Sequence, residues 1–187
     1  MTVINDRKIK QLLNDKQIII DPLPQNIQIQ PASVDLRLDN SYLTFKSTST
    51  GVIDTRKEQY YTNYNTFSDN DPLVLQQNEF ILGQTVERVK LPDNILGRVE
   101  GRSSIGRLGV AIHITAGFID PGFNGNITLE ICNLGNIPVV LYPNQRVCQI
   151  VFEELNGECE NPYGADGRNK YQGQTTPTPS TIFNDYK

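Results

Sequence analysis

The chain has 187 residues, of which 37% are hydrophobic, and a formal net charge of −4 at pH 7. This length suits one domain with a sizeable core, and the composition is far from that of a disordered chain. The negative charge argues against general binding to nucleic acids or anionic membranes, because both would favour a basic surface.

The N-terminal residues predict a short helix. Asn5 is a suitable N-cap, and Ile4 and Ile9 stand at the two positions of a hydrophobic staple. Ile9 and Leu12 then begin an apolar stripe with helical spacing. Because Pro22 follows a short apolar run, a long helix does not continue there.

Most of the remaining chain predicts short β-strands. Apolar residues alternate or cluster in short runs, and we expect strands at residues 33–38, 73–75, 80–82, 97–100 and 127–132. In the last strand, Glu130 lies on the face opposite its apolar neighbours. Many short strands after one early helix predict a mainly β protein, a barrel or sandwich with small helical additions.

Turn signals and two polar stretches complete the prediction. Asn124-Gly125 is typical of a tight turn, and residues 139–142, a Pro-Asn turn and residues 147–152 predict a hairpin. Residues 47–70 predict a long excursion from the core, to which the sequence assigns no role. The polar tail at 156–187 is compatible with disorder, although its Tyr-Gln-Gly-Gln run argues against that simple interpretation.

Cysteine and histidine usage argues against zinc chemistry. The chain has Cys132, Cys148, Cys159 and a single His113, and no Cys-x-x-Cys pair. A zinc deaminase needs His or Cys ligands and a Pro-Cys-x-x-Cys segment, so we expect no zinc. A sparse, odd set of cysteines, with no leader and no run of 18 apolar residues, favours a cytoplasmic protein without a membrane segment.

The most concentrated chemistry lies in the stretch that ends at Glu130. It begins with donors that suit phosphate oxygens, namely Arg102, Ser103, Ser104 and Arg107. The alternative for these residues is a solvated basic turn. Glu130 would be a usable proton shuttle if its side of the strand is enclosed, and an ordinary surface glutamate if it is not.

Two other polar residues in this stretch have competing interpretations. Asp120 precedes Pro-Gly, which fits the start of a turn as well as a carboxylate that orients a water toward a phosphorus atom. His113 stands among apolar neighbours, which predicts a buried, hydrogen-bonded histidine rather than a catalytic one. With one histidine, a Ser-His-Asp triad is not expected.

Six motifs in this order resemble those of the dCTP deaminases in the trimeric dUTPase-like superfamily. They extend over almost the whole chain, at residues 30–38, 101–107, 115–122, 127–130, 145–149 and 170–174. The resemblance implies a distorted β-barrel of the dUTPase-like type and a homotrimer with active sites at subunit interfaces. It further implies one domain over residues 1–187, with residues 156–187 as a C-terminal lid.

The resemblance also implies catalytic roles. Glu130 would be the acid/base that helps a water attack C4 of cytosine. Ser103, Arg107 and the main-chain carbonyl of Ala116 would hold that water and the exocyclic amine. Asp120 would face the sugar.

Further matched residues would bind the substrate. Arg102 and Ser104 would take phosphate oxygens, and Thr128 would lie beside the base. The remaining expected contacts are Ile105, Gly106, Leu129, Gln149, Tyr163, Lys170 and Gln174, the last four reaching the triphosphate. A magnesium ion would be carried by the triphosphate rather than by protein side chains.

The family has two branches, which differ after Thr115 and Ala116. Monofunctional members release dUTP and usually have Thr-Ala-His, whereas bifunctional members have Thr-Ala-Gly and continue to dUMP and pyrophosphate. Gly117, Phe118 and the tail resemble the bifunctional branch. A glycine would leave space beside the phosphates for a water oriented by Asp120, and the alternative is that Gly117 serves only a tight backbone turn.

The sequence therefore predicts a dUMP-forming dCTP deaminase. This hydrolase converts dCTP and two waters to dUMP, pyrophosphate and ammonia, and supplies dUMP for dTMP synthesis. Three alternatives stay open: a monofunctional dCTP deaminase that releases dUTP, a dUTP pyrophosphatase, and a non-catalytic nucleotide-binding trimer. The expected partners are dCTP, dUTP and the inhibitor dTTP, with neither nucleic acid nor membrane.

Overall fold

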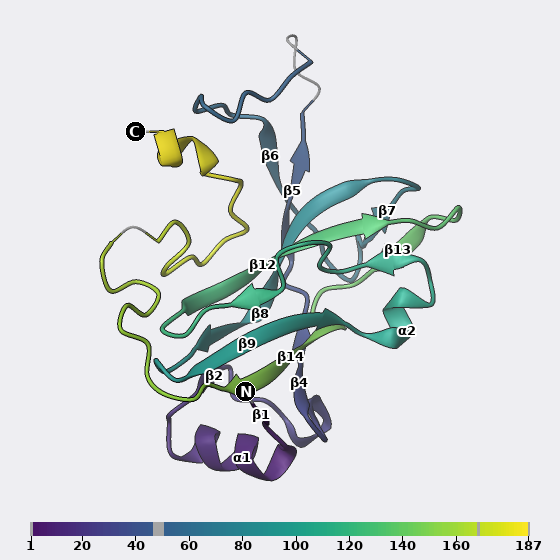
Figure 1. The fold of residues 1–187 in the computed structure, drawn as a ribbon. Helices are drawn as coiled ribbons and strands as arrows, with labels where there is room; N and C mark the ends of the chain where they lie inside the picture. The colour runs from purple at the N-terminus through teal and green to yellow at the C-terminus, as the bar shows by residue number, and fades with distance from the viewer. Residues whose placement is uncertain (1, 47–50, 168, 187) are drawn as a thin grey trace.

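The computed structural model describes residues 2–46, 51–167 and 169–186 (Figure 1). Strands dominate it, and every strand pairing in it is antiparallel. The strands are β1 (Thr2–Val3), β2 (Ile19–Asp21), β3 (Ile29–Gln30), β4 (Ser33–Arg37), β5 (Ser41–Phe45), β6 (Thr62–Thr66), β7 (Leu73–Leu75), β8 (Phe80–Lys90), β9 (Ile95–Gly101), β10 (Val110–Ala111), β11 (Phe118–Ile119), β12 (Asn124–Asn133), β13 (Val139–Leu141) and β14 (Arg146–Glu154). The helices are short: α1 (Asp6–Asn14), α2 (Ser103–Gly106) and the 3₁₀ turns η1 (Asn26–Gln28) and η2 (Ile182–Tyr186).

Two six-stranded sheets form the body. The first has the order β11-β9-β14-β4-β3, with β1 beside β14, and the second has the order β10-β12-β8-β5-β6, with β2 beside β8. A single bridge between Leu38 and Thr85 connects the end of β4 with β8. The mainly β, distorted barrel architecture that the sequence predicted is confirmed.

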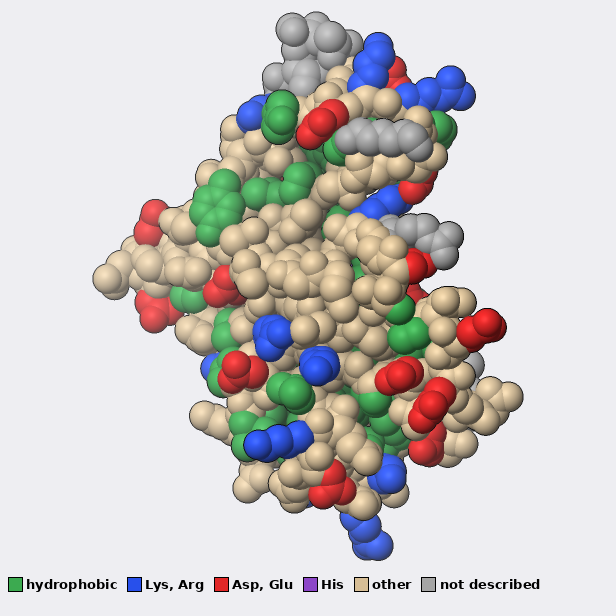
Figure 2. Space-filling view, turned by 90° about the vertical axis from the view of Figure 1, so that its left-hand side faces the viewer, with side chains coloured by type: hydrophobic (Ala, Val, Ile, Leu, Met, Phe, Trp, Pro, Cys, Tyr) green, Lys and Arg blue, Asp and Glu red, His purple; other side chains and the backbone are tan. Residues whose placement is uncertain are grey.

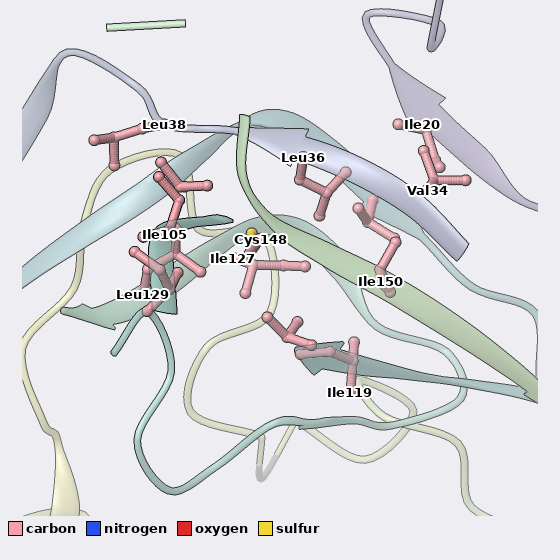
Figure 3. Packing of buried hydrophobic residues seen from close by; sticks show 14 of the residues in the cluster. Ile20, Val34, Leu36, Leu38, Ile105, Ile119, Ile127, Leu129, Cys148 and Ile150 are labelled. Carbon is pink, nitrogen blue, oxygen red and sulfur yellow. The ribbon is translucent and has the colours of Figure 1, made fainter. Parts of the chain in front are cut away.

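Side chains from both sheets meet in one core (Figure 3). Leu36 on β4, Leu129 on β12 and Ile150 on β14 are all completely buried. Each such side chain stabilises the fold by about 1.5–3 kcal/mol relative to an exposed one. The alternation in β12 places Glu130 on the opposite, accessible face, as the sequence predicted.

The N-terminal helix forms as expected. The Asn5 side chain caps α1 by accepting a hydrogen bond from the Lys8 backbone N–H at 3.0 Å. Ile4 and Ile9, the two staple positions, are buried, and Leu12 joins them in the core. No helix among the described residues is long and apolar enough to cross a membrane.

Two local predictions are wrong. Asn124 and Gly125 lie inside β12, whereas the turn before the strand contains Gly122, which has a φ of +87°. Residues 139–142 and 147–152 do not form a hairpin, because β13 pairs with β7 while β14 lies between β4 and β9. In both places, pairing with distant segments decides where the strands lie, although the chain does turn at Pro143 and Asn144 as predicted.

The two polar stretches are more ordered than their composition suggests. Within residues 47–70, β6 pairs with β5 along its whole length, and Phe67 is buried; residues 47–50 lie outside the described residues. The tail returns along the side of the body and ends near β6 (Figure 1). The face on that side consists largely of backbone and uncharged polar side chains (Figure 2). The described part of the tail is therefore packed against the body.

Candidate active site

Most of the predicted site residues lie in two separate pockets. The larger has a volume of about 860 Å³ and is lined by Asp120, Thr128, Glu130, Ala116 and tail residues, and we call it the carboxylate pocket. The smaller, of about 320 Å³, is lined by Arg102, Ser103, Ser104 and Gln149, and we call it the arginine pocket. The two pockets share no lining residue.

The Glu130 carboxylate is fixed by one neighbouring residue. Its Oε2 accepts hydrogen bonds from the Thr115 backbone N–H at 3.1 Å and the Thr115 hydroxyl at 2.9 Å. Hydrogen bonds to a charged acceptor each contribute about 1.5–3 kcal/mol. Neither bond uses Oε1, so one carboxylate oxygen of Glu130 stays available to a molecule in the pocket.

The tail crosses the carboxylate pocket beside β12. The Asn126 N–H donates to the Gln174 carbonyl at 2.9 Å, and the Gly173 N–H donates to the Asn124 carbonyl at 2.8 Å. The Gln174 side chain adds a 2.6 Å hydrogen bond to the Asn126 carbonyl. The Thr128 hydroxyl donates to Gln174 Oε1 at 3.3 Å, which joins two predicted substrate contacts.

Two further tail residues line the same pocket. Tyr163 lies near Phe123, with ring centroids 5.9 Å apart, and its hydroxyl accepts a hydrogen bond from the Tyr171 N–H. Burial raises the pKa of Tyr163. Lys170 Nζ is 2.6 Å from the Asp185 carboxylate, and this hydrogen bond raises the pKa of Lys170.

The arginine pocket is organised by a buried carboxylate. Asp35 on β4 is 2% exposed, and its Oδ2 is 3.2 Å from Arg102 Nε and 3.0 Å from Arg146 Nη1. Burial raises the pKa of Asp35, while Arg102 and Arg146 act in the opposite direction. On the adjacent strand β14, Gln149 accepts a 2.7 Å hydrogen bond from the Ser33 hydroxyl.

Four predicted substrate contacts line neither pocket. Ile105 and Leu129 are 4% and 0% exposed, so only their main-chain atoms can face a ligand. Gly106 and Arg107, at the end of α2, are exposed to solvent. The Arg107 side chain is therefore accessible to a molecule or subunit that docks on this edge.

Gly117 has a clear packing role. Its carbonyl accepts a 2.8 Å hydrogen bond from the Val99 N–H of β9, and a Cβ on Gly117 would lie only 2.8 Å from the Val99 carbonyl oxygen. Such a close contact shows that Gly117 lets its segment pack tightly against the backbone of β9. Phe118, which follows it, is 58% exposed.

His113 departs from its prediction. It lines the carboxylate pocket, and both its ring nitrogens are buried without a hydrogen-bond partner among the described residues. The predicted hydrogen bond of His113 is therefore absent among these residues, and the nearby polar groups of Thr115 are engaged by Glu130 instead. Among the same residues, no group of three or more His, Cys, Asp or Glu side chains could hold a metal, and the three cysteines form no disulfide.

Two functional neighbours were missed at the sequence level. Thr115 was part of a recognised motif, but nothing in the sequence showed that it would hold Glu130. Asp35 did leave a signal, because it is a charged residue within a strand of buried residues. A carboxylate at such a position requires cationic partners, which Arg102 and Arg146 provide.

The fold is that of a known class. A model of the dCTP deaminase-like family matches residues 3–155, and the chain belongs to this family. The crystal structure of 2′-deoxycytidine 5′-triphosphate deaminase from Agrobacterium tumefaciens has a similar fold. Its TM-score is 0.65 at 21% identity, over 81% of this chain and 48% of that one.

Curated relatives are similar along the whole chain. The dUMP-forming dCTP deaminase of Methanosphaera stadtmanae is 50% identical, covering 100% of this chain and 96% of that protein. The dUMP-forming dCTP deaminase of Methanothermobacter thermautotrophicus is 49% identical, covering 100% and 97%. The dCTP deaminase of Natronomonas pharaonis is 42% identical, covering 98% and 96%.

Proposed function

We propose that the chain is a dUMP-forming dCTP deaminase that converts dCTP and two waters to dUMP, pyrophosphate and ammonia. The observation that carries the proposal is the Glu130 carboxylate, oriented by Thr115 in a pocket of about 860 Å³. The full-length similarity to relatives named for this reaction supports it. The product dUMP would serve dTMP synthesis.

The active site is assembled from two copies of the chain. The carboxylate pocket holds the acid/base and the tail, whereas the arginine pocket holds hydroxyl and guanidinium donors, and the two have no residue in common. A homotrimer in which the arginine pocket and Arg107 of one copy face the carboxylate pocket of the next would bring both sets together. Closed rings of this kind use the same pair of surfaces at every interface.

Deamination then follows from the side chains in place. Glu130 takes a proton from a water that adds to C4 of cytosine and delivers it to N3 of the ring. It then takes the second proton from the new C4 hydroxyl and passes it to the departing amine, so that the C4 carbonyl forms as ammonia leaves. Ser103, Arg107 and the Ala116 carbonyl hold the water and the amine. The bond formed is C4–O and the bond broken is C4–N, so the products are dUTP and ammonia.

Hydrolysis of the triphosphate is the second step. Asp120 is exposed in the same pocket, where its carboxylate can orient a water toward the α-phosphorus, so that pyrophosphate leaves and dUMP remains. Arg102, Ser104, Gln149, Tyr163, Lys170 and Gln174 bind phosphate oxygens. Magnesium carried by the triphosphate, rather than by protein side chains, would neutralise phosphate charge.

The remaining assignments concern the whole chain. Residues 1–187 form one domain, in which the tail at 156–187 serves as a lid over the nucleotide. The base contacts Thr128 and the backbone at Leu129, while Ile105 and Gly106 contribute main-chain atoms. We place the enzyme in the cytoplasm, where its cysteines stay reduced, and expect dTTP to inhibit it by occupying the same site.

Incubation of the purified chain with dCTP and magnesium tests the proposal. Ammonia, dUTP, dUMP and pyrophosphate are quantified over time, and we expect ammonia and dUMP in equal amounts with little free dUTP. Accumulation of dUTP would assign the chain to the monofunctional branch. Cleavage of dUTP without action on dCTP would make it a dUTP pyrophosphatase, and nucleotide binding without turnover would make it a binding protein.

A further inference from the structure

We propose that Tyr61 is a positioning residue, which holds the C-terminal tail over the carboxylate pocket. Tyr61 belongs to residues 51–61, the described part of the excursion that precedes β6, and we call these residues the 51–61 segment. This segment and the end of the tail both line the carboxylate pocket. The inference rests on the proposed function only where it concerns nucleotide binding.

The Tyr61 hydroxyl makes a two-way contact with the tail. It accepts a hydrogen bond from the Ser180 N–H at 3.1 Å and donates one to the Ser180 carbonyl at 3.4 Å. Both partners are backbone groups, so the contact depends on the path of the tail rather than on the residue type at position 180. Ser180 is 119 residues from Tyr61 in the chain, and only the folded tail brings them together.

The Tyr61 ring is itself anchored to the body. It stacks on Phe45 of β5, with ring centroids 5.7 Å apart and an interplanar angle of 26°. Phe45 in turn contacts Phe80 of β8, at 5.3 Å between centroids. The hydroxyl therefore projects from an aromatic stack on the body, which makes it a suitable anchor for the tail.

A second contact holds η2, beyond Ser180. The Arg56 guanidinium of the 51–61 segment lies 5.5 Å from the centroid of the Tyr186 ring. On the other side of η2, Asp185 pairs with Lys170 at 2.6 Å. The last residues of the tail are thus held both by the 51–61 segment and by a lysine that we expect to reach the triphosphate.

These contacts connect the 51–61 segment with nucleotide binding. Lys170 and Gln174 can meet the phosphates only when the tail lies across the pocket. A lid that is already positioned loses less conformational freedom when the ligand binds, so binding is tighter. Removal of the Tyr61 hydroxyl should therefore weaken binding of dCTP without changing the chemistry at Glu130.

Tyr61→Phe tests the inference, with Tyr64→Phe as the matched control. The first variant keeps the aromatic stack and loses only the hydroxyl, whereas Tyr64 is 58% exposed on β6 and lines neither pocket. Loss of this hydrogen bond should raise the amide hydrogen-exchange rate of residues 178–182 about three- to tenfold in the nucleotide-free protein. The KM for dCTP should rise by a similar factor while kcat stays within about twofold.

Each outcome decides one part of the inference. Faster exchange together with a higher KM, neither of them seen in Tyr64→Phe, supports it. Unchanged exchange in Tyr61→Phe overturns the contact, and faster exchange with an unchanged KM overturns the positioning role. Because exchange is measured without nucleotide, it decides the contact even if the chain does not act on dCTP.

Discussion

Replacement of Gly117 by alanine tests how this chain uses its bifunctional-type motif. The new Cβ would lie 2.8 Å from the Val99 carbonyl oxygen, and this contact must lengthen by several tenths of an ångström. The shift weakens the 2.8 Å hydrogen bond from the Val99 N–H to the Gly117 carbonyl. Overpacking costs about 1–3 kcal/mol and a lost hydrogen bond about 1 kcal/mol, so we expect destabilisation by about 2 kcal/mol.

Thermal unfolding and product analysis together measure the effect. For a domain of this size, 2 kcal/mol lowers the Tm by roughly 4–8 °C. Gly157→Ala is the matched control, because a Cβ on Gly157 meets nothing within 4 Å. The displaced segment between β10 and β11 also contains Thr115, which holds Glu130. The kcat for dCTP should therefore fall in Gly117→Ala.

The histidine found in monofunctional members gives a sharper version of this test. We expect Gly117→His to lose deamination as well as dUMP formation, because the backbone at residue 117 would have to move away from β9 and would displace Thr115. An unchanged Tm, together with dUTP released at the normal rate, would refute the packing argument. That result would instead favour open space at Gly117 as the determinant of dUMP formation.

Four further outcomes follow. Glu130→Gln should lose dCTP deamination by several orders of magnitude, more than the roughly 10²–10⁴ of a single general acid/base, while calorimetry still detects dCTP binding. Asp35→Asn should raise the KM for dCTP about tenfold through loss of the ion pair that orients Arg102. The folded-state pKa of Asp35 lies above its unfolded value, so its contribution to stability is greatest at acid pH and is lost as pH rises through the folded value. The urea midpoint of the natural chain should therefore fall relative to that of Asp35→Asn as the pH is raised from 4. Finally, maleimide should label the partly exposed Cys159 in the folded protein but not Cys148, since burial raises the pKa of the Cys148 thiol.

Local patterns in the sequence predicted the elements that depend on neighbouring residues. The Asn5 cap and the staple specify α1, and the alternation from Ile127 to Cys132 specifies both the strand and the accessible face of Glu130. These features depend on the spacing of apolar residues within one segment, so they can be recognised from that segment alone. The sequence therefore predicted the type of each of these elements and the face that it buries, but not its partner, which for β12 is the distant strand β8.

Long-range pairing decided the features that the sequence did not reveal. Val140 pairs with Val74 and not with β14, so the expected hairpin is absent. Gly125 looked like a turn residue, but in β12 its lack of a side chain lets the tail approach, since a Cβ there would lie 3.1 Å from the Gln174 carbonyl. A local signal cannot separate these two uses of glycine.

The division of the site into two pockets was also invisible in the sequence. Arg102 and Glu130 belong to one short stretch of the chain, which invites a single site built from adjacent residues. Arg102 follows β9 of the first sheet, however, whereas Glu130 lies on β12 of the second. The family resemblance implies sites between subunits, and the separation of the two pockets supports the shared site that we propose.

A mixing experiment tests this assembly most directly. Glu130→Gln and Arg107→Ala chains, each nearly inactive alone, are unfolded, mixed in equal amounts and refolded. If every site takes Glu130 from one copy and Arg107 from its neighbour, random mixing restores about a quarter of the normal dCTP deamination. Deamination that stays at the level of the separate variants, although mass spectrometry shows mixed trimers, would contradict a site shared between two copies.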